Sequence, residues 1–225
     1  MRTIRRFRFE PSALAGGPTL IDRYLGRDDH ARRGRWVGPP LDGVIEVALH
    51  DTCASTATID TRDTVATIWH VLWVRDDAAA SVAIGEDAWP IAPGDTVVVP
   101  PGEALYLEGR QLAVKIAIPG VETHPEPPTH GLERFAGYNR QTIYRQAGAI
   151  RLCRWKLTQP LALAAHHPGP VLTLALARDS TIRTSTAIDR LRQGELALID
   201  PATNPTVAPD GLSYLLTIDR DPSTS

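Results

Sequence analysis

The sequence predicts an all-β protein made of two similar barrels in tandem. The main observation is an internal repeat with a period of about 100 residues, since a repeat of this kind fixes the architecture. Residues 94–118, GDTVVVPPGEALYLEGRQLAVKIAI, align without a gap to residues 194–218, GELALIDPATNPTVAPDGLSYLLTI. Two further observations agree with it: the apolar runs are short and bounded by turn residues, and helical signals are scarce.

The elements follow one order in both halves. A turn glycine and an acidic residue precede an apolar run, which a proline ends at Pro101 and Pro201, and a polar loop then leads to a final apolar strand. The same register pairs residues 70–74 with 170–174, and Val82 with Ile182. We expect earlier strands at 43–50 and 149–157, where apolar and polar positions are mixed as in a half-buried strand.

Proline and glycine limit the helical content and mark the domain boundary. The best helical candidate, residues 11–26, contains Gly16, Gly17 and Pro18, so we expect only short helical turns there. The segment between the repeats resists both helix and central strand because it contains Pro119, Pro125, Pro127 and Pro128. The sequence therefore predicts a first barrel with an N-terminal extension and this connection in residues 1–130, and a second barrel in 131–225.

Composition excludes several classes of partner. The 225 residues have a formal net charge of −2, with no basic stripe to attract nucleic acid. No apolar run reaches the roughly 20 residues that cross a bilayer, so we expect a cytoplasmic protein with no membrane partner. Cys53 and Cys153 are too few for a disulfide framework and are expected to be buried thiols. Exposed sheet edges would suit a homodimer.

Residues 91–109, IAPGDTVVVPPGEALYLEG, resemble the second motif of the cupins. The wider order of segments resembles class I phosphomannose isomerases, two-barrel zinc enzymes that interconvert mannose 6-phosphate and fructose 6-phosphate. The stretches that carry this resemblance are IDRYLG at 21–26, GVIEVALHD at 43–51, ATIWHVLWV at 66–74 and IRLCRWKL at 150–157. The resemblance implies two tandem cupin (jelly-roll) β-barrels with few short helices.

The positions that correspond to the zinc ligands of that family hold other residues here. The resemblance places the four ligand positions at Thr58, Asp60, Thr67 and Leu105. Catalytic zinc takes about three protein ligands, and only Asp60 is a suitable residue. We therefore predict no metal cofactor and a non-catalytic protein of mannose-6-phosphate isomerase-like ancestry.

The same positions suggest a ligand pocket in the first barrel. Trp69 and Trp73 share the strand face of Thr67, and an aromatic ring can stack on a sugar, although core packing is the more common role of a tryptophan. The predicted pocket consists of Thr58, Asp60, Thr67, Trp69, Trp73 and Leu105. A small carbohydrate, a sugar or sugar phosphate, is the expected ligand.

Two alternatives stay open at the level of the sequence. His50 and His70 could form a relocated zinc site that supports an aldose–ketose isomerase, but strict alternation places His70 on the face opposite Thr67. The pair His166-His167 lies in the second half, where His167 aligns with Thr67 of the first. No catalytic residue is assigned, and the repeat does not decide which barrel binds the ligand.

Overall fold

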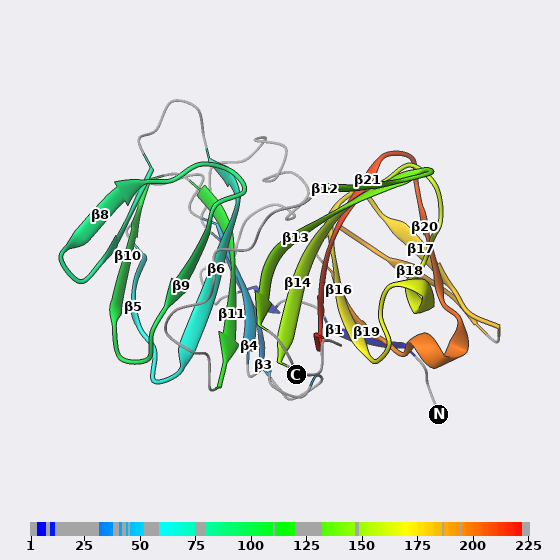
Figure 1. Ribbon diagram of the computed structural model, residues 1–225, viewed down its shortest axis with the longest axis horizontal. Helices are drawn as coiled ribbons and strands as arrows, with labels where there is room; N and C mark the ends of the chain where they lie inside the picture. The colour runs from blue at the N-terminus through cyan, green and yellow to red at the C-terminus, as the bar shows by residue number, and fades with distance from the viewer. Residues whose placement is uncertain are drawn as a thin grey trace. The chain divides into compact units, whose positions relative to one another are not determined.

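The structure is a computed structural model (Figure 1). It describes residues 4–7, 10–11, 32–37, 41, 44, 46–51, 59–74, 80–109, 111–119, 132–146, 149–185, 187–193 and 195–221. Among them the only helical segments are two 3-10 turns, η1 (Leu163–Ala165) and η2 (Pro201–Thr203). The predicted all-β fold of two tandem cupin barrels is confirmed. The helical candidate at 11–26 lies, apart from Pro11, outside the described residues.

The first barrel consists of two antiparallel sheets. The six-stranded sheet has the order β2-β3-β4-β11-β6-β9, with bounds Glu10–Pro11, Arg32–Val37, Glu46–Asp51, Gln111–Ile118, Ala66–Val74 and Thr96–Val99. The four-stranded sheet has the order β5-β10-β7-β8, with bounds Ile59–Arg62, Ala104–Glu108, Ser81–Ile84 and Asp87–Pro90. Their facing side chains form one apolar core: Trp69, Val71, Ala80, Val82, Ile91, Val97, Val99, Leu105, Leu107 and Ala113.

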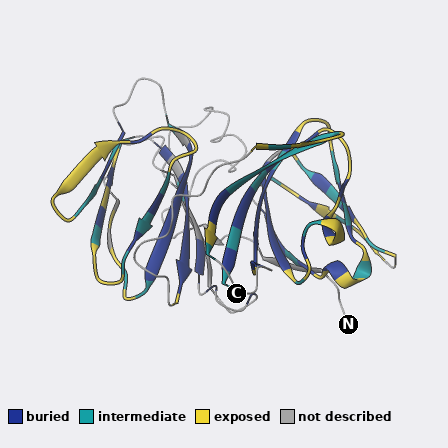
Figure 2. Ribbon diagram, viewed as in Figure 1, coloured by how far each residue is buried: buried dark blue, intermediate teal, exposed yellow. Residues whose placement is uncertain are grey.

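The second barrel repeats this plan. Its seven-stranded sheet has the order β1-β19-β16-β21-β14-β13-β12, with bounds Ile4–Phe7, Leu196–Ile199, Val171–Ala177, Ser213–Asp219, Ile150–Leu157, Tyr138–Gln146 and Leu132–Phe135. The four-stranded sheet has the order β15-β20-β17-β18, with bounds Leu161–Ala162, Thr206–Pro209, Ser180–Arg183 and Ile188–Leu191. Figure 2 shows buried residues along the strands of both barrels.

The internal repeat of the sequence reappears as matched strands. β6, β9 and β11 of the first barrel correspond to β16, β19 and β21 of the second, at the spacing that the alignment predicts. The expected early strands appear as β4 and β14, but each is preceded by another antiparallel strand, β3 and β13 respectively. Alternation in the sequence does not indicate β3 or β13, because polar residues occupy neighbouring positions in both RRGRWV and YNRQTIYRQ.

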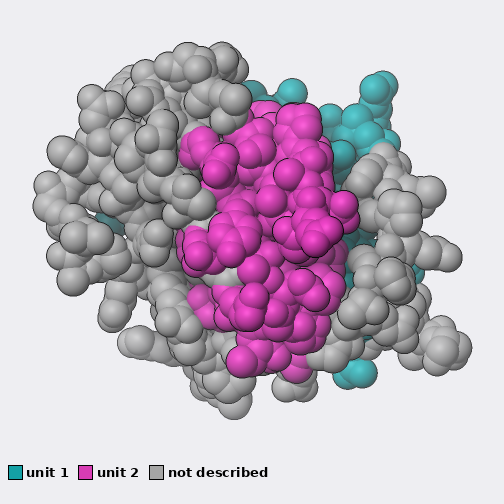
Figure 3. All heavy atoms as spheres, turned by 90° about the vertical axis from the view of Figure 1, so that its left-hand side faces the viewer, with its two compact units in different colours: residues 1–8, 40–43, 125–225 teal, residues 9–39, 44–124 magenta. Residues whose placement is uncertain are grey.

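The chain forms two compact units, coloured in Figure 3. One comprises residues 1–8, 40–43 and 125–225, and the other comprises 9–39 and 44–124. The first unit includes the start of the chain because β1 pairs antiparallel with β19, from Ile4 opposite Ile199 to Phe7 opposite Leu196. The division of the sequence into 1–130 and 131–225 could not foresee this strand, whose pairing depends on residues about 190 positions away.

Candidate functional site

Trp69 and Thr67 lie together on the inner face of β6. The indole Nε1 of Trp69 donates a hydrogen bond to Thr67 Oγ1 at 3.1 Å, and Trp69 is only 1% exposed. Its ring packs in the apolar core of the first barrel and lies 4.8 Å from the ring of His50. Trp69 therefore fills the core, which leaves its ring no exposed face on which a sugar could stack.

The other predicted pocket residues do not gather around Trp69. Leu105 is fully buried in the same core. Asp60 pairs across the sheet with Tyr106, which is 39% exposed, whereas Leu105 and Leu107 point inward on either side. Asp60 thus lies on the outer face of its sheet. Thr58 lies outside the described residues, as does the side chain of Trp73.

These residues do not fit the zinc ion that the resemblance implies. Leu105 has no donor atom, the hydroxyl oxygen of Thr67 accepts from Trp69, and Asp60 faces outward. Across the described segments there is no group of three or more His, Cys, Asp or Glu side chains placed to hold a metal. The disagreement arises from residue chemistry, because zinc needs nitrogen, sulfur or carboxylate ligands converging from several strands.

His50 and His70 lie on opposite faces of one sheet. Ala113 of β11 is the cross-strand partner of both His50 and Val71, so His50 shares the inner face with Val71. His70 is on the other face, where its Nδ1 lies 3.0 Å from Thr96 Oγ1. The structure does not bring these two imidazoles together, which agrees with their alternation in the sequence.

A partly buried ion pair in the first barrel escaped the sequence reasoning. Lys115 Nζ lies 2.6 Å from Asp63 Oδ1 and 5.9 Å from the centroid of the Trp69 ring. Lys115 is 6% exposed and is the cross-strand neighbour of Trp69. Because its charge is neutralised by Asp63 and covered by the barrel, this lysine belongs to the packing around Trp69.

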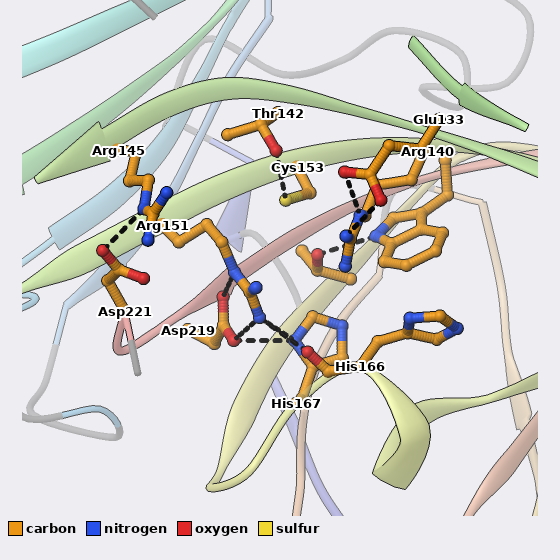
Figure 4. Close-up of polar contacts among 12 residues, drawn as sticks. Glu133, Arg140, Thr142, Arg145, Arg151, Cys153, His166, His167, Asp219 and Asp221 are labelled. Carbon is orange, nitrogen blue, oxygen red and sulfur yellow. Dashed lines mark hydrogen bonds and ion pairs between the residues drawn. The ribbon is translucent and has the colours of Figure 1, made fainter. Parts of the chain in front are cut away.

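The interior of the second barrel holds several polar side chains. Cys153, Trp155 and Leu215 belong to its core, so residues an even number of positions away on β14 and β21 face the same interior. These are Arg151, Thr217 and Asp219. On β13 the inward positions are Tyr138, Arg140 and Thr142, opposite Leu157, Trp155 and Cys153. Figure 4 shows Arg140, Thr142, Arg151, Cys153 and Asp219 among the polar contacts of this interior.

Four aromatic rings, Phe135, Tyr138, Trp155 and His166, form what we call the aromatic cluster. The Phe135 and Tyr138 rings are stacked, with centroids 4.9 Å apart and planes at 25°. His166 meets Trp155 edge-on at 5.1 Å and Phe135 at 5.3 Å. Trp155 is fully buried, whereas Phe135 is 37% exposed, so the cluster runs from the barrel core to solvent.

An ion pair borders the aromatic cluster. Arg140 donates through Nε to Glu133 Oε1 at 3.1 Å and through Nη2 to Glu133 Oε2, a two-point contact. The guanidinium carbon lies 5.6 Å from the Trp155 centroid and 5.9 Å from that of Phe135. The guanidinium is thereby held beside aromatic faces with its Glu133 counter-ion, an arrangement that presents donors and acceptors next to a stacking surface.

His166 joins the aromatic cluster to the polar interior. Its Nε2 lies 3.0 Å from the Tyr138 hydroxyl. Burial lowers the pKa of His166, and the positive charges of Arg140 and Arg151 lower it further. This lowered pKa favours the neutral imidazole, which shares a hydrogen bond with the Tyr138 hydroxyl through Nε2.

A buried network of Arg151, Asp219 and His167 lies deeper in the barrel. Arg151 donates to both carboxylate oxygens of Asp219, Nε to Oδ1 at 3.1 Å and Nη2 to Oδ2 at 2.6 Å. His167 Nδ1 lies 2.8 Å from Asp219 Oδ2. Arg151 also donates to the His166 carbonyl at 2.6 Å. The side chains of Asp219 and His167 are 2% and 0% exposed, so the pair is shielded from water.

An interior row of small polar side chains crosses the sheet between these two clusters. Thr142, Cys153, Thr217 and Thr173 are successive cross-strand partners on β13, β14, β21 and β16. Trp155 Nε1 donates to Thr217 Oγ1 at 2.8 Å. The prediction that Cys153 is a buried thiol is confirmed, and its burial raises its pKa to about 11. Cys53 lies outside the described residues.

One weak signal in the sequence indicated this second site. His167 aligns with Thr67 in the repeat, and both are buried. The alternation of YNRQT and IRLCRW could have placed Tyr138, Arg140 and Trp155 on one face. It could not have indicated that Asp219, more than 50 residues from His167, completes the buried network.

Two jelly-roll barrels in tandem with this repeat define a protein of the cupin fold with two barrels, a bicupin. No protein-family model matches the chain, and no curated protein matches it significantly. Among the described residues, no helix is long and apolar enough to cross a membrane.

Solved structures similar to this chain carry the same fold. One is oxalate decarboxylase from Bacillus subtilis, a protein with Mn(II) centres. The match spans 98% of this chain and 78% of that protein, at 9% identity and a TM-score of 0.63. The match to AerE from Microcystis aeruginosa spans 95% of this chain and 97% of that protein, at 9% identity and a TM-score of 0.62. The match to a cupin 2 conserved barrel domain protein from Leptotrichia buccalis spans 85% of this chain and 89% of that protein, at 10% identity and a TM-score of 0.52. At these identities the likeness establishes the cupin fold and nothing finer.

Proposed function

We propose that this chain is a non-catalytic bicupin of phosphomannose isomerase-like ancestry that binds a small carbohydrate with the aromatic cluster of its second barrel. The observation that carries the proposal is the stacked pair Phe135–Tyr138, exposed at Phe135 and bordered by the Arg140–Glu133 ion pair. Sugars present an apolar ring face and a rim of hydroxyls, which aromatic faces and charged donors or acceptors complement.

The second barrel is preferred to the first for a physical reason. The first barrel packs Trp69 and Leu105 in its closed apolar core, whereas the second barrel holds the aromatic cluster and polar side chains among its inward residues, with Phe135 exposed. Buried polar groups cost stability unless they are satisfied, so an interior that keeps them favours a binding role. No observation favours an isomerase built on His50 and His70, since these lie on opposite faces of the sheet.

The test is calorimetric titration of the purified protein with mannose, glucose, fructose and their 6-phosphates. We expect at least one sugar to bind, and Phe135→Ala to weaken it at least tenfold, since stacking contributes on the order of 1 kcal/mol or more beyond area burial. Trp89→Ala is the matched control, because Trp89 is 39% exposed and lies in the first barrel, on β8. Equal affinity in Phe135→Ala and wild type would contradict the proposed site.

The non-catalytic part has its own test. Elemental analysis after dialysis against chelator, followed by isomerase assays with added zinc, manganese or iron, is expected to show neither one equivalent of metal nor turnover of mannose 6-phosphate. Turnover that depends on an added metal would overturn this part and leave the sugar-binding part standing.

A further inference from the structure

The imidazole of His167 has a free acceptor inside the second barrel. Its Nδ1 contacts the Asp219 carboxylate, which can only accept, so Nδ1 carries the hydrogen and Nε2 a lone pair when the ring is neutral. Nε2 is buried and has no hydrogen-bond partner among the described residues. A buried polar atom in this condition is a position where a ligand or water is expected.

A second unsatisfied atom lies on the same interior. Thr173 is fully buried, and its Oγ1 has no partner within the described part of the chain. Thr173 is the cross-strand partner of Thr217, which accepts from Trp155, and lies two residues along β16 from Val171, the partner of Asp219. The Trp155 ring is 5.8 Å from that of His167. Oγ1 of Thr173 is thus linked to Trp155 through Thr217, and Nε2 of His167 belongs to a ring beside Trp155.

The chemistry of these two atoms selects a hydroxyl. A hydroxyl can donate to the lone pair of Nε2 and accept from the hydroxyl of Thr173, whereas a carboxylate or phosphate oxygen can donate to neither. A cation is disfavoured because Arg151 Nη2 lies 3.5 Å from His167 Nδ1, and like charges repel strongly away from water. Arg151 and Asp219 already neutralise each other, so a neutral group adds no uncompensated charge.

We propose that His167 and Thr173 form a hydroxyl-recognition site for a bound polyol. One hydroxyl of the polyol donates a hydrogen bond to His167 Nε2 and also bonds to the Thr173 hydroxyl. The inference rests on the proposed carbohydrate binding and makes the second barrel selective for neutral hydroxyl groups at this position. Asp219 and Arg151 are positioning residues that fix the ring and its hydrogen. The aromatic cluster holds the ring of the same ligand nearer to solvent.

Two substitutions test this site by calorimetric titration with the sugar that binds the wild-type protein. Thr173→Val removes the hydroxyl but keeps the shape, and His167→Asn keeps a donor for Asp219 but removes Nε2. Each is expected to weaken the sugar about three- to tenfold, the effect of one lost hydrogen bond, whereas Thr173→Ser restores the affinity. If Thr173→Val and His167→Asn bind as tightly as wild type while Phe135→Ala does not, this inference fails and the carbohydrate proposal stands.

Glycerol provides a probe that does not need the aromatic cluster. The protein is labelled with ring-¹⁵N histidine, and the His167 signals are assigned by their loss in His167→Asn. Glycerol is expected to shift the ¹⁵N resonance of His167 Nε2 saturably in both wild type and Phe135→Ala. Formate, which has no hydroxyl to donate, is expected to leave it unchanged. A shift with glycerol when no hexose binds would sustain this inference and overturn the carbohydrate proposal, and no shift in either protein would overturn the inference.

Discussion

Nδ1 of His167 lies 2.8 Å from Oδ2 of Asp219, although 52 residues separate the two in the chain. The contact joins the loop after η1 to the end of β21, and Arg151 of β14 completes it from a third element. Both partners are almost fully buried. Three separate segments thus converge on one carboxylate, which makes Asp219 the centre of the polar interior of the second barrel.

Removing the charge of Asp219 should destabilise the fold strongly. Asp219→Asn leaves the Arg151 guanidinium buried without its counter-charge, so we expect the free energy of unfolding to fall by about 3–5 kcal/mol. Urea denaturation monitored by circular dichroism measures this free energy of unfolding. Arg190→Gln is the control, because the Arg190–Asp179 pair is 62% and 20% exposed and should contribute about 0–1 kcal/mol. Equal losses in the two variants would contradict the role given to the buried network.

The thiol of Cys153 should make stability fall at alkaline pH. Burial raises its pKa from 9.0 to about 11, so the unfolded chain loses the thiol proton before the folded chain does. The stabilisation is complete below pH 9 and lost as pH rises through 11, by about 2 kcal/mol at that point. Burial also raises the pKa of Tyr144, so the measurement is the difference between wild type and Cys153→Ala across this range. A difference that does not vary with pH would contradict the prediction.

His166 should titrate below its ordinary range. Burial and the charge of Arg140 lower its pKa from 6.5, so the unfolded chain takes up the proton first and stability falls as pH drops below 6.5. Arg140→Gln should raise the pKa of His166, which proton NMR of its ring reports. Arg154→Gln is the control, since Arg154 lies against Tyr214 on the other face of β14. The same pKa of His166 in wild type and Arg140→Gln would show that Arg140 does not influence this ring.

Gly137 should be required for the turn that carries the aromatic cluster. It has a φ of +86° between β12 and β13, and a Cβ there would collide with the side chain of Gln159. We expect Gly137→Ala to cost about 2–3 kcal/mol, the sum of a strained backbone and a clash. Gly85 also has a positive φ, of +60°, but open space around it, so Gly85→Ala should cost only about 1 kcal/mol. Thermal unfolding compares the two, and a smaller loss for Gly137→Ala would contradict the clash.

The strands of each barrel were predictable because their signals are local. Apolar runs such as TVVV of β9 and LALI of β19 are ended by turn residues, and the repeat carries this order from one half to the other. The start of the chain was not predictable, since β1 joins the second barrel by pairing with β19. Backbone pairing of an edge strand leaves little trace in side-chain pattern.

Only the residue types of the candidate site could be known from the sequence. The sequence by itself determined that Leu105 has no donor atom and that Thr67 lacks the nitrogen, sulfur or carboxylate atoms that zinc takes as ligands. Only the tertiary structure decided that Trp69 closes the core of the first barrel, and that Phe135, Tyr138, Trp155 and His166 meet in the second. The physical reason is that burial and hydrogen-bond partners depend on which strands face each other, and the pairs that matter here lie far apart in the chain.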